Sequence, residues 1–224
     1  MEQTKPNKNK WISFLADGIL SGLMLGIGGM VSLSSENRFL GAFLFSLGLF
    51  CIVQFKYGLF TGKVGYIVNR DLPYVAETAV TLVGNALGTL IAALLLRQVR
   101  FFTSTVSTMD VTISDRVQAT VSGKIHDNPL SIFILAIFCG ILMFTAVEGS
   151  RKCREEKNFT GSLFVVVMPV MVFIICGFNH CIADMFYYFF AGCPEPSKAI
   201  VYFILAIAGN SVGGMIIPLL KKLS

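Results

Sequence analysis

The chain has 224 residues, of which 54% are hydrophobic and only 14% are charged, and its mean hydropathy is +0.73. So few charges exclude an ordinary soluble domain with a polar surface and indicate a protein of the lipid bilayer. The formal net charge of +5 comes without a basic stripe interleaved with aromatic residues, so nothing in it points to nucleic acid as a partner.

Six stretches of the chain are long and apolar enough to cross a bilayer as helices, each of which needs about 20 mostly apolar residues. Little sequence is left between them, so the chain is predicted to be an all-α membrane protein. In chain order the stretches are Trp11–Leu33, Leu40–Ile67, Tyr74–Leu96, Leu130–Val147, Gly161–Phe190 and Ile200–Leu220.

The second and fifth stretches differ from the others because glycine and polar residues interrupt each of them near its middle. The interruptions lie around Thr61 and around Asn179 and His180. Unpaired peptide groups are costly in hydrocarbon, so irregular backbone persists there only inside protein or along a water-filled cavity. The sequence therefore predicts two broken helices that face a cavity.

Each half of the chain has the same order of features: a broken stretch, then a stretch with the pattern G-N-x-x-G. The pattern occurs at Gly84–Gly88 and at Gly209–Gly213. Because each half holds three helices, the halves must lie in opposite orientations. We therefore expect an inverted repeat of about 11–97 and 129–220 within a single channel domain, 11–224. Such folds place the solute path near the midplane, at the repeat interface.

The asparagines of this pattern, Asn85 and Asn210, are expected to bond across helices or onto the freed backbone of the broken stretches. Small residues let membrane helices approach closely, so the glycines of the pattern are expected to serve packing. The same role is predicted for Gly18, Gly22 and Gly26 in the first stretch.

Basic residues suggest the orientation of the chain in the membrane. They gather before the first stretch, between the fourth and fifth, and at the C-terminus, and six spans put these three regions on one side. By the positive-inside rule this side is the cytoplasm of a plasma or inner membrane. Residues 1–10 are then a cytoplasmic tail. The polar segment Arg97–Asn128, predicted as a loop on the other side, carries basic residues that work against this orientation.

Ionisable residues deep in apolar stretches are rare and mark functional sites. Here they are Lys56 and Lys63 beside the first interruption, and His180 and Asp184 at the second. A helix that restarts at the second interruption would direct free N–H groups at the cavity, which favours an anion. An unperturbed imidazole titrates near neutral pH, so His180 could act there as a cation, a neutral donor or a proton source. Lys56 would add to the attraction.

No cofactor, metal or catalytic activity is expected. Cys176, His180 and Cys181 offer three metal ligands without a fourth nearby, and the six cysteines lack the paired spacing of a disulfide framework. The chain contains no nucleophile elbow, phosphate loop or zinc-protease motif.

At these residues the chain resembles the formate/nitrite transporter family. The resemblance is strongest over Arg38–Asn69, which contains FSLGLF and LFTG, and over Val167–Tyr187, which contains MPVMVFIICGFNHCIADMFY. The segments VGNALG and AGNSVGG support it. It implies a membrane channel for small monovalent anions of weak acids, with an aquaporin-like fold and five protomers that each hold one pore.

The resemblance also implies roles for single residues. Thr61 resembles the family's threonine in the loop that breaks the second helix, and His180 resembles its central pore histidine. Four more residues match the apolar constriction of the pore: Phe45, Leu49, Leu59 and Phe173. Apolar rings would exclude hydrated ions and pass a small solute that is weakly hydrated or neutralised.

Three positions depart from the family pattern. Asn179 stands where the family usually has an acid, Phe144 where it has an asparagine, and Asp184 where it has another asparagine. Residues four apart share a helix face, so Asp184 is expected to bond His180 in place of the lost acid. A pairing of Asp184 with Lys56 is the rival, and Lys124 is a candidate for the lysine that the family often carries before the fourth span.

The sequence thus favours a channel for a small anion of the formate, nitrite or hydrosulfide class, passive or proton-linked through His180. In the alternative, the same pore passes a small neutral polar solute, because Asn179 replaces the acid and Phe144 narrows the path. A redox subunit that uses the Cys–His cluster and a purely structural scaffold are the remaining readings. The expected partners are a small anion, the lipid bilayer and further copies of the chain.

Overall fold

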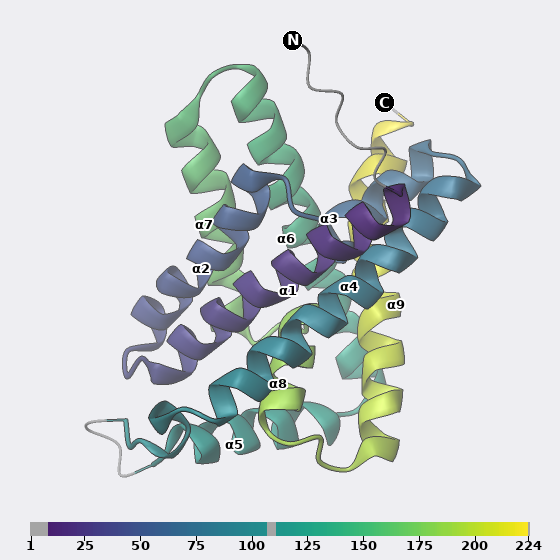
Figure 1. Ribbon diagram of the computed structural model, residues 1–224. Helices are drawn as coiled ribbons and strands as arrows, with labels where there is room; N and C mark the ends of the chain where they lie inside the picture. Colours follow the sequence, from purple (N-terminus) through teal and green to yellow (C-terminus); the bar gives the residue numbers. More distant parts are fainter. Residues whose placement is uncertain (1–8, 107–110, 224) are drawn as a thin grey trace.

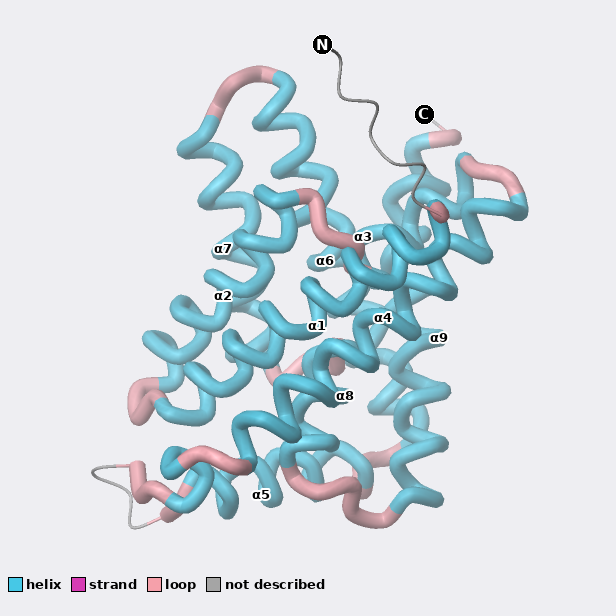
Figure 2. Tube along the Cα trace, in the orientation of Figure 1, coloured by secondary structure: helices cyan, strands magenta, loops and turns pink. Residues whose placement is uncertain are grey.

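The computed structural model describes residues 9–106 and 111–223, so most of the predicted tail 1–10 lies outside the described residues. Over the described ranges the chain is helical, with a single isolated β-bridge between Thr105 and Thr112 (Figures 1 and 2). The helices in chain order are α1 (Lys10–Ser34), α2 (Arg38–Phe55), α3 (Phe60–Lys63), the 3-10 helix η1 (Val64–Asn69), α4 (Leu72–Arg97), the 3-10 helix η2 (Arg100–Thr103), α5 (Ile113–Ile125), α6 (Pro129–Glu155), α7 (Phe159–Cys176), α8 (Cys181–Phe190) and α9 (Pro196–Lys221).

Six helices of the described residues are long and apolar enough to cross a membrane: α1, α2, α4, α6, α7 and α9. Each of them overlaps one of the six predicted stretches, so the prediction of a multi-pass, all-α membrane protein is confirmed. The helices begin where the sequence supplies caps, because Asn side chains accept hydrogen bonds from otherwise unpaired N–H groups of the first turn. Asn9, Asn37, Asn128 and Asn158 do this for α1, α2, α6 and α7.

Two helix pairs form the densest packing of the fold, α1 against α4 and α6 against α9. A Cβ atom added to Gly18 would lie 2.9 Å from the Cα of Gly84, and one added to Gly22 would lie 2.8 Å from the Cα of Gly88. The prediction that these glycines serve close helix packing is confirmed, since no larger residue fits at this separation.

Different helix ends and connections lie at the two ends of the bundle. The start of α1, the connection between α6 and α7, and the end of α9 lie at one end, at the top of Figure 1. At the opposite end lie α5 and the connection from α8 to α9. The basic residues of the α6–α7 connection and of the C-terminal end of α9 therefore share one side of the molecule.

The segment Arg97–Asn128 was predicted as a loop, and this prediction is wrong for its second half, which forms α5. Thr112 and Asp115 form a reciprocal capping box at its start, which satisfies two N–H groups of the first turn. The buried side chains of α5 recur every four residues and make one apolar face toward the bundle: Ile113, Val117, Val121 and Ile125.

Candidate functional site

Two short non-helical segments follow α2 and α7. Residues 56–59 separate α2 from α3, and residues 177–180 separate α7 from α8. Both preceding helices end in a left-handed residue, Lys56 with φ 60° and Gly177 with φ 70°. This conformation stops a helix and turns the chain.

Asn85 and Asn210 hold these two segments in the same way. The N–H of Phe60 donates to Oδ1 of Asn85 at 2.8 Å, and Nδ2 of Asn85 donates to the carbonyls of Gly18 and Gly58. Both side chains are fully buried.

At the second segment the N–H of Cys181 donates to Oδ1 of Asn210 at 2.9 Å, and Nδ2 of Asn210 donates to the carbonyls of Ala136 and Asn179. Each asparagine therefore bonds one backbone group inside a non-helical segment and one at the start of the next helix, as predicted, and ties them to a neighbouring long helix.

The two segments bring Thr61 and His180 into contact. Oγ1 of Thr61 lies 3.1 Å from Nε2 of His180, and the two residues are 0% and 1% exposed. The backbone N–H of Ala183 donates to Nδ1 of His180 at 3.1 Å. A neutral imidazole carries a hydrogen on only one nitrogen, so here the hydrogen is on Nε2. His180 therefore donates to the Thr61 hydroxyl.

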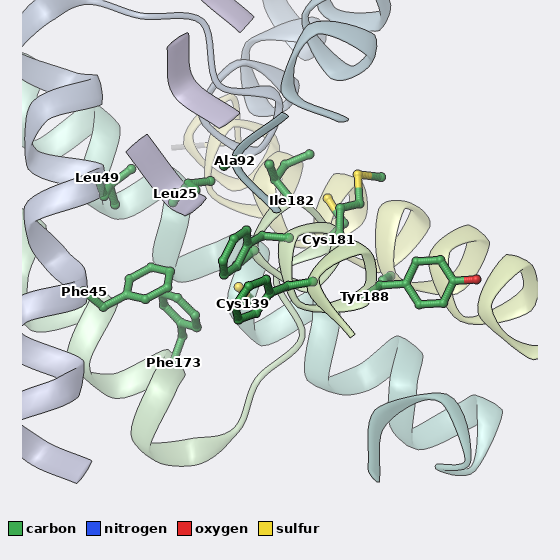
Figure 3. Close-up of a cluster of buried hydrophobic side chains, with 14 of the residues drawn as sticks. Leu25, Phe45, Leu49, Ala92, Cys139, Phe173, Cys181, Ile182 and Tyr188 are labelled. Carbon is green, nitrogen blue, oxygen red and sulfur yellow. The ribbon is translucent and has the colours of Figure 1, made fainter. Parts of the chain in front are cut away.

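The four predicted constriction residues are buried apolar side chains. Phe45, Leu49, Leu59 and Phe173 are each at most 5% exposed. Figure 3 shows the rings of Phe45 and Phe173 side by side. They pack edge to face, with 5.7 Å between their centroids, and the centroid of the Phe173 ring lies 5.6 Å from that of His180. Of the predicted constriction residues, Phe173 therefore lies against His180 and Phe45 packs on Phe173.

Two cavities flank the pair from different sides. The larger, about 450 Å³, is lined by Phe173 and by residues on both sides of His180, including Gly177 and Ala183. The smaller, about 160 Å³, is lined by residues on both sides of Thr61, Leu59 and Gly62. Thr61 and His180 therefore lie between the two openings.

The charged side chains that line these cavities are mostly cationic. The larger cavity has Arg38, Arg116 and Lys124 against Glu36 and Asp184. The charged residues of the smaller cavity are Lys56, Lys63 and Arg154. By formal charge both sides are positive, which raises the local concentration of anions.

A chain of polar contacts begins at Lys124 and Asp184, which line the larger cavity. Nζ of Lys124 donates to Oδ1 of Asn179 at 2.8 Å and lies 3.2 Å from Oδ1 of Asp184. The hydroxyl of Tyr202 donates to Oδ2 of Asp184 at 2.6 Å. Nδ2 of Asn179 donates to the carbonyl of Ile132. Two of the three residues that depart from the family pattern, Asn179 and Asp184, therefore share one partner, Lys124.

The expected bond between the side chains of Asp184 and His180 is wrong. The oxygens of Asp184 contact Lys124 and Tyr202, and Nδ1 of His180 is occupied by the N–H of Ala183. The rival pairing with Lys56 is also wrong, because Lys56 lines the smaller cavity and Asp184 the larger. Residues four apart share a helix face, but the first turn of α8 directs His180 toward Thr61 and Asp184 toward α5 and α9.

Phe144 was expected to narrow the path, and its position argues against this role. Its ring packs on Tyr66, with centroids 5.4 Å apart, and it lines a third cavity together with Glu148 and Pro218. It belongs to neither lining of the two cavities that flank Thr61 and His180.

Two residues of this chain of polar contacts were not identified as site residues from the sequence. Lys124 was only a candidate, because the segment before the fourth span differs in length from the family's. The capping box and the four-residue apolar spacing of α5 could have identified this helix. Tyr202 was missed, and no local pattern connects it with Asp184, 18 residues earlier on another helix.

The sequence model of the formate/nitrite transporter family matches residues 2–222. The chain belongs to the formate/nitrite transporter family. Among curated members, formate channel FocA of Haemophilus influenzae is 26% identical over 194 residues, which cover 81% of this chain and 67% of the relative. Transporter YrhG of Bacillus subtilis is 26% identical over 225 residues, which cover 91% of this chain and 81% of the relative.

Among solved structures, a pentameric formate channel with formate bound matches with a TM-score of 0.77 and 23% identity. The match covers 97% of this chain and 98% of the other. At this identity it establishes a shared fold. The family consists of transporters and channels, so the membership agrees with the expectation of a transport protein.

Proposed function

We propose that the protein is a channel for small monovalent anions of weak acids, of the formate, nitrite or hydrosulfide class. One observation carries the proposal: the buried contact between Thr61 and His180 lies between two cavities, each with an excess of cationic side chains. Membership of the formate/nitrite transporter family supports the same class of solute.

The path runs from the larger cavity past Phe173 to His180 and Thr61, and then past Leu59 to the smaller cavity. Apolar rings on this path exclude hydrated ions, and a bare anion there needs a donor because its desolvation is costly. The Nε2–H group of His180 and the Thr61 hydroxyl are the donors within reach.

The geometry around His180 supports a neutral donor that passes the anion without becoming a cation. A second ring proton would sit on Nδ1, where it would face the N–H of Ala183 and cost that hydrogen bond. Passive passage through a hydrogen-bonding site therefore fits this chain better than proton transfer from an imidazolium.

We further propose that α2 with α3, and α7 with α8, are two broken membrane spans of an inverted repeat. The helices α2 and α7 each have 18 residues, each ends in a left-handed residue, and each is followed by four residues before the next helix. The matching bonds of Asn85 and Asn210 support the same relation.

The assembly and orientation follow as proposals. The solved relative described as a pentameric formate channel supports a pentamer with one path in each protomer. The connection between α6 and α7 is basic, and it lies at the same end of the bundle as Lys221 and Lys222 at the end of α9. By the positive-inside rule that end faces the cytoplasm.

The test is a flux panel in proteoliposomes loaded with purified protein. Formate, nitrite and hydrosulfide are expected to pass, and chloride is expected to pass far more slowly. His180→Ala should reduce formate flux, because it removes the central donor. Equal passage of chloride and formate, or formate flux that survives His180→Ala unchanged, would overturn the proposal.

One observation favours the second candidate, a small neutral polar solute. Lys124 already has a carboxylate partner in Asp184 and an amide partner in Asn179, so part of its charge is compensated within the protein. Urea in the same panel decides between the two: urea flux above formate flux would favour the neutral solute.

A further inference from the structure

Tyr202 is a buried residue of α9 whose contacts connect it with the proposed path. It is 1% exposed, and its hydroxyl donates to Oδ2 of Asp184 at 2.6 Å. It does not belong to the lining of the 450 Å³ cavity; it lies behind Asp184 and lines two smaller cavities. The hydrogen bond to Asp184 gives Tyr202 a route by which it can act on the solute.

Asp184 divides its two oxygens between two donors. Oδ2 receives the Tyr202 hydroxyl, and Oδ1 lies 3.2 Å from Nζ of Lys124. The carboxylate is 4% exposed, and a buried carboxylate is stable only when its oxygens are bonded. The hydrogen bond from Tyr202 therefore weakens the interaction of Asp184 with Lys124, and the interaction with Lys124 weakens the hydrogen bond from Tyr202.

Lys124 is shared in turn. It donates to Oδ1 of Asn179 at 2.8 Å, and the amide of Asn179 is oriented by its donation to the carbonyl of Ile132. Lys124 also lines the large cavity, so an anion there competes with Asp184 and Asn179 for the same ammonium group. The strength of the ion pair between Asp184 and Lys124 therefore affects how strongly Lys124 binds the anion.

We propose that Tyr202 is a positioning residue for anion passage: by bonding Asp184, it limits the hold of Asp184 on Lys124 and leaves this ammonium group available to the anion. The inference rests on the proposed anion channel. It assigns a role to a residue outside the path. It also explains how anion passage is compatible with a carboxylate at position 184, since Tyr202 weakens the interaction of this carboxylate with Lys124.

The experiment is a double-mutant cycle of Tyr202→Phe and Asp184→Asn, with KM and maximal flux of formate measured in proteoliposomes. Tyr202→Phe removes one oxygen atom, so Lys124 becomes the main donor to Asp184 and KM should rise at least about twofold. Asp184→Asn removes the competing charge, so KM should fall. In the double variant the Tyr202 effect should vanish, because its route through the carboxylate is gone.

Tyr188→Phe is the matched control, since Tyr188 lies in the same α8–α9 contact and packs its ring on Phe203. Its KM should equal that of the native protein. If Tyr202→Phe does not fold, 3-fluorotyrosine at position 202 gives the test, because its hydroxyl is a stronger donor and KM should then fall.

The outcomes separate the two proposals. A native protein that passes none of the three anions overturns the proposed function, and this inference falls with it. A native protein that passes formate leaves the function standing. In that case an unchanged KM in Tyr202→Phe overturns only the role of Tyr202. An equal change of KM when Tyr202→Phe is made in the native protein and in the Asp184→Asn variant also overturns it. An unchanged KM with fluorotyrosine does the same.

Discussion

Asn210 connects the helix packing of the fold directly with the backbone that carries His180. Its side chain is fully buried and makes three hydrogen bonds, to the N–H of Cys181 and to the carbonyls of Asn179 and Ala136. Two of these groups belong to the residues on either side of His180. Asn210→Ala removes all three bonds at once and leaves the three backbone groups without this partner.

The expected loss follows from the number of bonds. Hydrogen bonds between side chains and neighbouring helices inside membranes contribute about 0.6 kcal/mol on average and up to about 1.7 kcal/mol. Three of them give a loss of about 2 to 5 kcal/mol in the free energy of unfolding. Formate flux per folded protein should fall as well, because the backbone that carries His180 loses its anchor.

The measurement is the unfolding free energy in mixed detergent micelles, combined with formate flux in proteoliposomes. Ser211→Ala is the matched control, because the Ser211 hydroxyl donates within its own helix to the carbonyl of Ile207. A loss in Asn210→Ala no larger than the loss in Ser211→Ala would refute the reasoning.

Three further predictions concern separate parts of the molecule. Phe173→Ala removes a ring that touches Phe45 and His180, so acetate flux should rise relative to formate flux in the same vesicles; an unchanged ratio would count against a constriction there. Lys124→Gln removes a cation from the larger cavity, and an attraction of at least ~1 kcal/mol predicts about a fivefold higher KM for formate, measured against native protein. Gly22→Ala places a Cβ 2.7 Å from the N of Thr89 and should cost about 1–3 kcal/mol of unfolding free energy, whereas Gly123→Ala, with open space at its Cβ, should not; equal thermal stability of the two variants would contradict this.

Local patterns were enough to predict much of this architecture. The apolar stretches predict six membrane helices because each helix must satisfy its own backbone in lipid. The asparagines of the G-N-x-x-G patterns were expected to bond freed backbone, and both do so. The resemblance of two long segments was enough to identify the family.

The partners of single polar side chains could not be predicted in the same way. The helical spacing of His180 and Asp184 suggested a bond, yet Asp184 contacts residues 60 positions earlier and 18 positions later. A spacing rule states which residues share a helix face and is silent on what that face meets. Phe144 shows the same limit, because alignment by position does not say which cavity a ring enters.

The sequence by itself determined the membrane class, the number of spans, the family and the candidates Thr61 and His180, because these depend on composition, length and short motifs. Only the tertiary structure decided that these two residues touch, that α5 carries Lys124 to the cavity wall, and that Asp184 bonds Lys124 and Tyr202. These contacts join residues far apart in the chain. The first arises where α3 meets the start of α8, and the others arise where α5, α8 and α9 pack around the buried carboxylate of Asp184.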